Sequence, residues 1–175
     1  RDWSSDVCSS DLKEQSLFDE CMKTSSAISK RRIKHADGFA SSVNKLLLQM
    51  GMPNAKIKIQ ISENILSMHG IDSVDFMFDA NKSDKFESLG KVASGGELSR
   101  LMLSIKSLVA KKLELSTLIF DEIDTGISGE AARQVGIIMK ELSDFHQVIA
   151  ITHQAQIAAK ASTHFFVHKQ NKGEK

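Results

Sequence analysis

Ala93-Ser94-Gly95-Gly96-Glu97-Leu98-Ser99-Arg100 is the stretch that best indicates the fold of this 175-residue chain. It leads directly into an apolar-periodic segment, residues 98–113, which predicts a helix beginning near Ser94. Ser94 followed three residues later by Glu97 has the form of a capping box. A helix N-terminus with two glycines also suits a phosphate, because its N–H groups are unpaired and no Cβ blocks the approach. A capped surface helix explains the same residues without a ligand, so the choice between a capped helix and a phosphate site depends on the rest of the sequence.

The segment that follows this helix alternates between strands and helices. Residues 117–120 and 148–151 are continuous apolar runs, as expected for strands buried on both faces, and residues 164–167 predict a third strand. Helical periodicity lies between them at residues 131–142 and around Ile157. This order predicts an α/β fold, a parallel sheet with flanking helices and right-handed crossovers.

The segment before the stretch is of a different kind. Residues 13–50 have apolar side chains at three- and four-residue steps, which predicts a long helix ended by Gly51 and Pro53. Its first half is sparsely apolar, like a helix leaving a coiled coil. Residues 57–61 and 74–78 alternate apolar and polar, which predicts an antiparallel pair joined by a loop around Gly70.

Composition sets the general class. Hydrophobic residues make up 41% of the chain and charged residues 26%, an ordinary globular balance, and the net charge of +1 argues against a chain that binds nucleic acid over its whole surface. Cys8 and Cys21 have neither metal-ligand nor disulfide spacing, and neither a long apolar run nor a secretory signal is found, so we expect a cytoplasmic protein with no membrane partner.

A small basic cluster is interpreted as a solvated face in preference to a DNA contact; it consists of Lys30, Arg31, Arg32 and Lys34.

The chain is expected to be a piece of a longer protein, cut at both ends. Residues 1–12 hold the single Trp, show no usable periodicity and resemble a translated sequencing adapter, so we expect them to be non-native. The charged segment 169–175 is expected to be cut short.

Three polar side chains follow the predicted buried strands. Asp121 and Glu122 come directly after residues 117–120, and His153 follows the next strand. Ligands of open α/β sheets bind beyond the carboxyl ends of the strands. Two acids in this place match a Walker B arrangement, in which the first holds Mg²⁺ and the second orients or deprotonates a water. For an isolated Asp-Glu pair, the simpler explanation is that acidic residues are common at strand ends because loops are exposed to solvent.

The order of the motifs favours the chemical interpretation. A Ser-Gly-Gly helix start, an Asp-Glu pair and a His follow one another as do the signature motif, Walker B and switch histidine of an ABC-type ATPase. Residues 91–100, 120–129 and 152–159 together resemble the RecN family of SMC-like DNA repair ATPases, and the likeness covers residues 13–175. Transporter ATPases share the signature and Walker B, but not the Asp-Thr-Gly-Ile-Ser-Gly run at residues 124–129.

The resemblance implies the C-terminal half of a P-loop ABC/SMC-type ATPase head. Residues 13–50 would be the coiled-coil exit helix and residues 51–175 the C-terminal ATPase lobe. No G-x-x-x-x-G-K-[ST] motif occurs in the 175 residues, so the Walker A half would belong to a missing N-terminal lobe. ATP and Mg²⁺ are the implied cofactors. The implied partners are that lobe, the second head of a homodimer, and DNA ends or single strands in the nucleoid.

The resemblance also implies a role for each motif residue. Asp121 would serve the Mg²⁺ shell, Glu122 would be the general base, and His153 would contact the γ-phosphate of ATP. Ser128 stands where SMC-type proteins carry a D-loop aspartate, so the role of a D-loop carboxylate does not carry over, and Ser128 is grouped with the nucleotide-binding residues. The signature residues would press on the γ-phosphate of ATP held by the opposite head; they are Ser94, Gly95, Gly96 and Glu97. Gln154 and Ala155 replace an expected Leu-Pro and would affect entry into the following helix.

Two other functions remain as alternatives. A transporter-coupled ABC ATPase is disfavoured by the coiled-coil exit helix that precedes the signature. A non-hydrolysing structural or DNA-binding module would be expected to lose the acids or the serine, and this chain keeps them.

Overall fold

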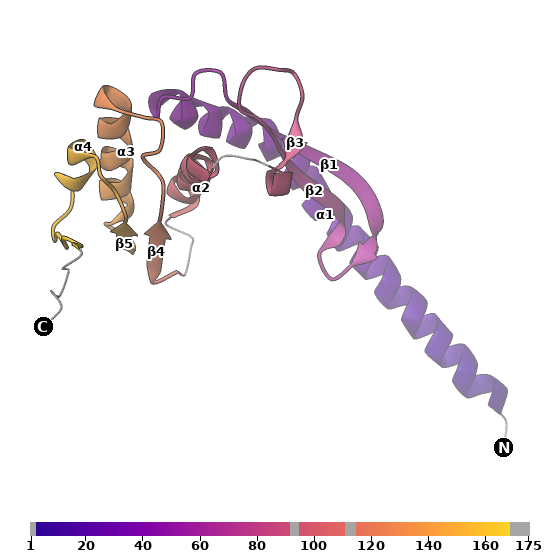
Figure 1. Cartoon of the computed structure of the whole chain (residues 1–175). Helices are drawn as coiled ribbons and strands as arrows, with labels where there is room; N and C mark the ends of the chain where they lie inside the picture. The colour runs from indigo at the N-terminus through magenta and orange to yellow at the C-terminus, as the bar shows by residue number, and fades with distance from the viewer. Residues whose placement is uncertain (1–2, 92–94, 111–114, 169–175) are drawn as a thin grey trace, which may run out of the picture. The chain divides into compact units, whose positions relative to one another are not determined.

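The computed structural model describes residues 3–91, 95–110 and 115–168, with side chains from residue 10 onward. The chain forms two compact units, one of residues 1–45 and 54–92 and the other of residues 46–53 and 93–175. The elements of both are drawn in Figure 1. No helix in the described part of the chain combines the length and apolar character that crossing a membrane requires.

The long helix predicted from the sequence is present. Helix α1 spans Trp3–Gln49, so it also includes most of the adapter-like segment (Figure 1). In the first half of the helix, the apolar side chains of Leu12, Leu17 and Phe18 are exposed. In its second half, Ala36, Ala40 and Val43 are buried. The sparsely apolar first half that the sequence indicated is thus the part whose apolar side chains are exposed.

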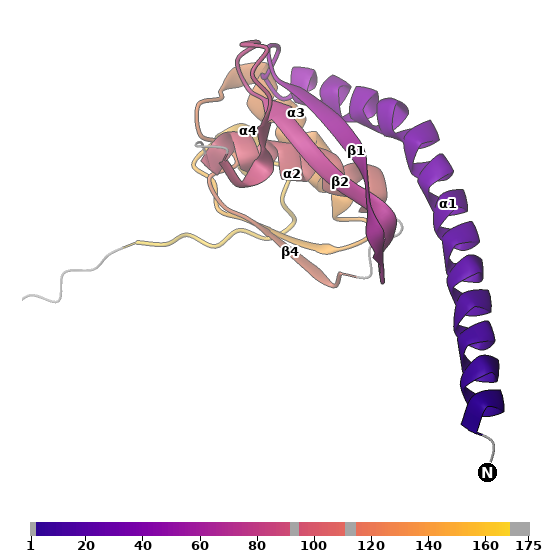
Figure 2. The ribbon, with the colours of Figure 1, turned by 90° about the vertical axis from the view of Figure 1, so that its right-hand side faces the viewer.

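A β-hairpin forms most of the remaining first unit. Strands β1 (Lys56–Ser67) and β2 (Gly70–Asp79) pair antiparallel, with a register irregularity between Glu63 and Ser67. Figure 2 shows the two strands side by side as a twisted ribbon. The short strand β3 (Glu87–Ser88) pairs with β2, and a 3-10 turn, η1 (Leu89–Lys91), follows it. The predicted antiparallel pair is therefore confirmed.

Two side chains of α1 hold this hairpin. Asn44 accepts a 2.8 Å hydrogen bond from the Ile57 N–H through Oδ1. Arg32 pairs with Asp72 at 2.9 Å and donates to the His69 carbonyl at 3.2 Å. Arg32 is thus engaged inside the unit, while its neighbours in the basic cluster are exposed.

The second unit has the predicted α/β order. Helix α2 (Gly95–Val109) precedes strand β4 (Thr117–Phe120), and helix α3 (Gly129–Leu142) connects it to strand β5 (Gln147–Ala150), after which comes the short helix α4 (Ala155–Ala158). Strands β4 and β5 are parallel, with Phe120 opposite Ala150. The core of the unit is apolar; its fully buried side chains include Leu101, Leu103, Ile123, Val135 and Leu142.

The predicted third strand is wrong. Residues 164–168 are in no strand, and Phe165, Phe166 and Val167 are about nine-tenths exposed, at 90%, 88% and 93%. The β-prone side chains gave the prediction, but such a composition does not decide whether a segment pairs with a neighbouring strand. In the described residues, this segment is not paired with any strand.

The prediction that both faces of the strands are buried is also wrong for this chain. Leu118 and Phe120 are buried, but Ile119 is 64% exposed on the opposite face of β4. Ile149 and Ile151, in and just beyond β5, are exposed as well. One face of a parallel sheet is therefore left open by the described elements, although such sheets are normally covered on both sides.

Candidate functional site

The acid turn lies directly after β4. Asp121 Oδ1 accepts a 2.9 Å hydrogen bond from the N–H of Glu122, and the Thr125 N–H donates to the Glu122 carbonyl at 3.2 Å. Glu122 has φ +55°, in the left-handed region that non-glycine residues rarely adopt. Both acids are exposed. A carboxylate held in an uncommon backbone conformation at the end of a strand is typical of functional turns.

The N-terminus of α2 packs against this turn. A Cβ at Gly96 would lie 2.9 Å from the Thr125 Cβ and 3.1 Å from the Glu122 carbonyl oxygen. A Cβ at Gly95 would collide with the Glu122 carboxylate, the far end of a flexible side chain. The sequence predicted that the glycines admit a phosphate. In the structure they admit the chain's own acid turn.

Two polar residues of α2 fasten the helix to the turn. Arg100 Nη1 donates to the Thr125 carbonyl at 2.7 Å and to the Ile123 carbonyl at 3.4 Å, and Ser99 Oγ donates to the Asp121 carbonyl at 3.0 Å. Burial lowers the pKa of Arg100, and the nearby Glu97 carboxylate opposes this shift. The sequence interpretation missed both residues. The signal was Arg100 lying one turn after Gly96, on the side of the helix that carries Leu103 and Ser104.

His153 lies beside a buried carboxylate, Asp124. Asp124 Oδ2 accepts hydrogen bonds from Thr152 Oγ1 at 2.5 Å and from the His153 N–H at 2.9 Å, and it lies 3.2 Å from His153 Nδ1. Burial acts to raise the pKa of Asp124, but the hydrogen bonds from Thr152 and His153 and the charge of the imidazole outweigh it, so the pKa is lowered. The Asp124 side chain is 4% exposed and that of His153 is 75% exposed.

A second set of hydrogen bonds joins the loop after β5 to the turn before α3. Gln154 Nε2 donates to the Ile127 carbonyl at 3.0 Å, and the Gln154 N–H donates to Thr152 Oγ1 at 3.0 Å. Gln154 also holds the N-cap position of α4, without a side-chain capping bond. Gln154 thus adds a contact to the turn before α3 that the sequence did not indicate.

The structure brings together four of the eight predicted site residues. Gly95, Gly96, Asp121 and Glu122 meet where α2 begins and β4 ends. Glu97 lies in the first turn of α2. Ser128 is exposed at the N-cap of α3, and its side chain makes no capping bond. Ser94, and with it the predicted capping box, lies outside the described residues.

The carboxylates that follow β4 have the chemistry of Mg²⁺ ligands. In the residues that the structure describes, His, Cys, Asp and Glu side chains form no cluster of three or more that could hold a metal. Mg²⁺ in nucleotide sites commonly takes one or two carboxylates and fills its shell with water and phosphate oxygens. An exposed Asp121 at the end of β4 suits that mode.

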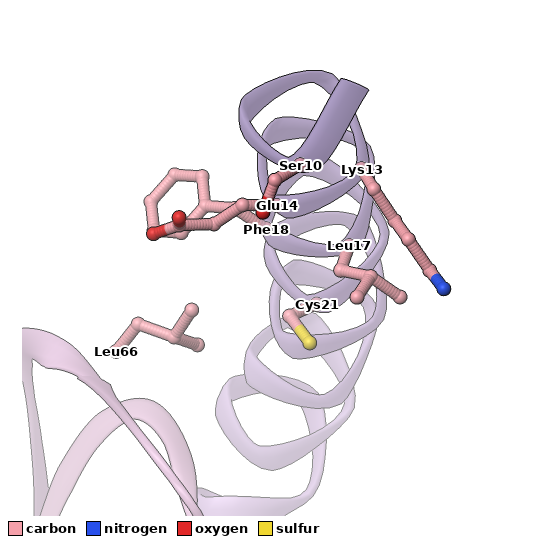
Figure 3. A pocket seen from close by; sticks show the side chains of 7 residues that line it. All are labelled: Ser10, Lys13, Glu14, Leu17, Phe18, Cys21 and Leu66. Atoms are coloured by element: carbon pink, nitrogen blue, oxygen red, sulfur yellow. The ribbon is translucent and has the colours of Figure 1, made fainter. Parts of the chain in front are cut away.

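A pocket in the first unit shares no residue with this site. It has a volume of about 430 Å³ and lies between α1 and the end of β1 (Figure 3). Its lining is largely apolar and consists of Ser10, Lys13, Glu14, Leu17, Phe18, Cys21 and Leu66. None of the motif residues lies in this lining, so the pocket is not a rival for the site.

The amino-acid sequence of the chain is similar to those of known DNA repair proteins. No protein-family model matches the chain. The chain is 39% identical over 167 residues to the DNA repair protein RecN of Treponema pallidum, covering 91% of this chain and 29% of that protein. It is 41% identical over 158 residues to RecN of Rickettsia typhi, covering 90% and 28%. The chain therefore spans less than a third of the length of these relatives.

A solved structure supports the fold. The Smc head domain of Pyrococcus yayanosii, with a coiled coil and joint, matches with a TM-score of 0.58 at 18% identity, over 87% of this chain and 28% of that one. At this identity the likeness concerns the fold alone. It confirms the predicted α/β class of an SMC-type head.

Proposed function

This chain is a segment of the RecN family of DNA repair proteins, and from that premise we propose that it is the C-terminal ATPase lobe of such a protein. In the whole protein, ATP binding would close a dimer of heads and hydrolysis would reopen it. These steps would drive engagement of DNA during recombinational repair of double-strand breaks. The observation that carries the proposal is the position of the exposed Asp121 and Glu122 directly after the parallel strand β4, in a turn that packs against the start of α2.

We assign the roles at the site by the chemistry of each group. Asp121 would hold Mg²⁺ and Glu122 would take a proton from the attacking water, since both carboxylates are exposed at the end of β4. His153 would contact the γ-phosphate through its exposed imidazole. Bound Mg²⁺-ATP supplies the phosphoryl group that is transferred to water.

The signature residues would act on a nucleotide held by the second head. The start of α2 offers backbone N–H groups and a partial positive charge to a phosphate. Gly95 is exposed there and lacks a Cβ that would keep the phosphate away. Ser94, Glu97 and Ser128 complete the proposed set of nucleotide contacts.

A separate N-terminal lobe would supply the P-loop. The sequence of this chain has no such motif, and the described part of the second unit leaves Ile119, Ile149 and Ile151 exposed on one sheet face. An apolar face of this kind is normally covered in parallel sheets. In this scheme residues 13–50 are the coiled-coil exit helix, residues 51–175 are the lobe, and residues 1–12 are non-native. We place the whole protein in the cytoplasm, with DNA in the nucleoid.

Reconstitution tests the proposal. This chain alone is expected to hydrolyse ATP negligibly, because it lacks the lysine and backbone cradle of a P-loop. Adding a separately produced N-terminal lobe of a RecN relative should restore turnover that rises with the concentration of the added lobe. The matched control is the same lobe with its P-loop lysine replaced by alanine. Turnover by this chain alone, or none with both lobes in a demonstrated complex, would contradict the proposal.

A further inference from the structure

A buried carboxylate outside the assigned machinery contacts the histidine loop at three points. Asp124 Oδ2 accepts from Thr152 Oγ1 and from the His153 N–H, and it lies 3.2 Å from His153 Nδ1. All three contacts use one oxygen. We propose that Asp124 is a positioning residue that fixes the His153 ring with Nδ1 turned inward and Nε2 turned toward the nucleotide. The nucleotide part of this inference rests on the proposed function, whereas the orientation of the ring does not.

The ring depends on Asp124 because little else holds it. The His153 side chain is 75% exposed, and among the described residues Asp124 is the one group in polar contact with its ring nitrogens. An exposed imidazole without a partner samples several rotamers. A carboxylate that also binds the backbone N–H of the same residue limits both the position of the loop and the rotation of the ring.

The charge of Asp124 also selects the tautomer. The partner of one ring nitrogen determines which nitrogen carries the proton. A carboxylate accepts hydrogen bonds and cannot donate them when ionised, so it favours a proton on Nδ1. Nε2 is then the nitrogen that faces outward. The lowered pKa of Asp124 means that this carboxylate stays ionised at neutral pH.

The same contact joins the histidine loop to the acid turn. Asp124 lies two residues after Glu122, in the turn closed by the Thr125 N–H and the Glu122 carbonyl. Gln154 ties the other end of the histidine loop to the Ile127 carbonyl at 3.0 Å. The general base and the phosphate-contacting histidine would therefore shift together when the turn shifts. Asp124 would set their relative placement without touching substrate.

Nitrogen-15 NMR of the histidine side chains in this chain tests the orientation directly. The His153 signals are identified by their loss in His153→Gln. In the neutral form of the ring we expect the proton mainly on Nδ1, and in Asp124→Asn a shift toward the Nε2-protonated form that free imidazoles favour. Asp144→Asn, an exposed aspartate of the same unit, is the matched control and should change nothing. A wild-type ring protonated mainly on Nε2 overturns the inference, whether or not Asp124→Asn folds.

A double-mutant cycle in the full-length protein tests the functional part. Asp124→Asn should lower kcat for ATP hydrolysis by roughly tenfold or more, as loss of an orienting partner does, with a smaller change in KM. In a His153→Gln background the same substitution should have no further effect. Equal, additive losses in both backgrounds would show a role that does not act through His153. If the protein has no ATPase at all, the proposed function fails while the NMR result still stands.

Discussion

Gly96 shows how closely α2 approaches the acid turn. A methyl group there would press on the Thr125 Cβ and on the Glu122 carbonyl, which cannot rotate away. Gly96→Ala should therefore lower the free energy of unfolding by about 1–3 kcal/mol, as overpacking does. Gly38→Ala is the control: nothing lies within 4 Å of its added Cβ in α1, so it should stabilise by about 0.5–1 kcal/mol. Urea unfolding measures both, and an unchanged midpoint for Gly96→Ala would contradict the close packing.

The carboxylate of Asp124 makes stability depend on pH. Its pKa is lower in the folded chain than in the unfolded one, so its contribution is present above the unfolded value, about 4, and is lost as the pH falls through the folded value. The difference in unfolding free energy between the wild type and Asp124→Asn should be constant near neutral pH and shrink below about pH 4. Chemical unfolding at a series of pH values measures this. A difference that grows in acid would mean that the carboxylate is not stabilised by its donors.

Residue-level prediction from the sequence was uneven. Asp121, Glu122 and His153 were singled out because strand ends and motif order indicate them. Asp124, Ser99 and Arg100 were not, because their roles come from contacts across the fold. Arg100 bonds carbonyls 23 and 25 residues away, and Asp124 contacts a loop 28 residues away. Motif spacing does not report partners at such separations.

At the scale of elements, one residue of the basic cluster on α1 binds the β-hairpin and the other three are exposed to solvent. Arg32 pairs with Asp72, whose side chain is 4% exposed, while Lys30, Arg31 and Lys34 are exposed. Hydrogen bonds from Ser29 and Arg32 lower the pKa of Asp72. Arg32→Gln should destabilise the chain, since it leaves a carboxylate that is shielded from water without its cation. Thermal unfolding measures the effect, with Arg31→Gln as the control that should leave stability within about 0.5 kcal/mol. Equal effects of the two substitutions would contradict the assignment.

Elements whose signal is local were predicted well. α1, α2, α3 and the β1–β2 pair follow from periodicity together with Gly51, Pro53 and Gly70. The prediction for residues 164–167 failed because β-prone composition does not decide whether a segment pairs with another strand. The same limit applies to the open face of β4 and β5. Apolar runs indicate that a strand will be covered, but not by which segment.

At the scale of the whole molecule, that open face is where a separate lobe would dock. Ile119→Glu should leave this chain folded, because Ile119 is 64% exposed, and should weaken its association with the N-terminal lobe of a RecN relative. Ile65→Glu on β1, where the side chain is 86% exposed, is the matched control and should leave association unchanged. Calorimetry or sedimentation of the mixed lobes measures the binding. Unweakened association of Ile119→Glu would place the lobe contact elsewhere.

Glu122→Gln in the full-length protein tests the central claim most directly, because it removes the proposed base and keeps the shape of the side chain. Hydrolysis of ATP should fall by at least about a hundredfold, the usual contribution of a general base. ATP-dependent association of the heads should persist, since the signature helix and Asp121 are untouched. Single-turnover hydrolysis and ATP-dependent sedimentation measured on the same preparation report both quantities. Hydrolysis at the unmodified rate would contradict the assignment of Glu122 and, with it, this account of the site.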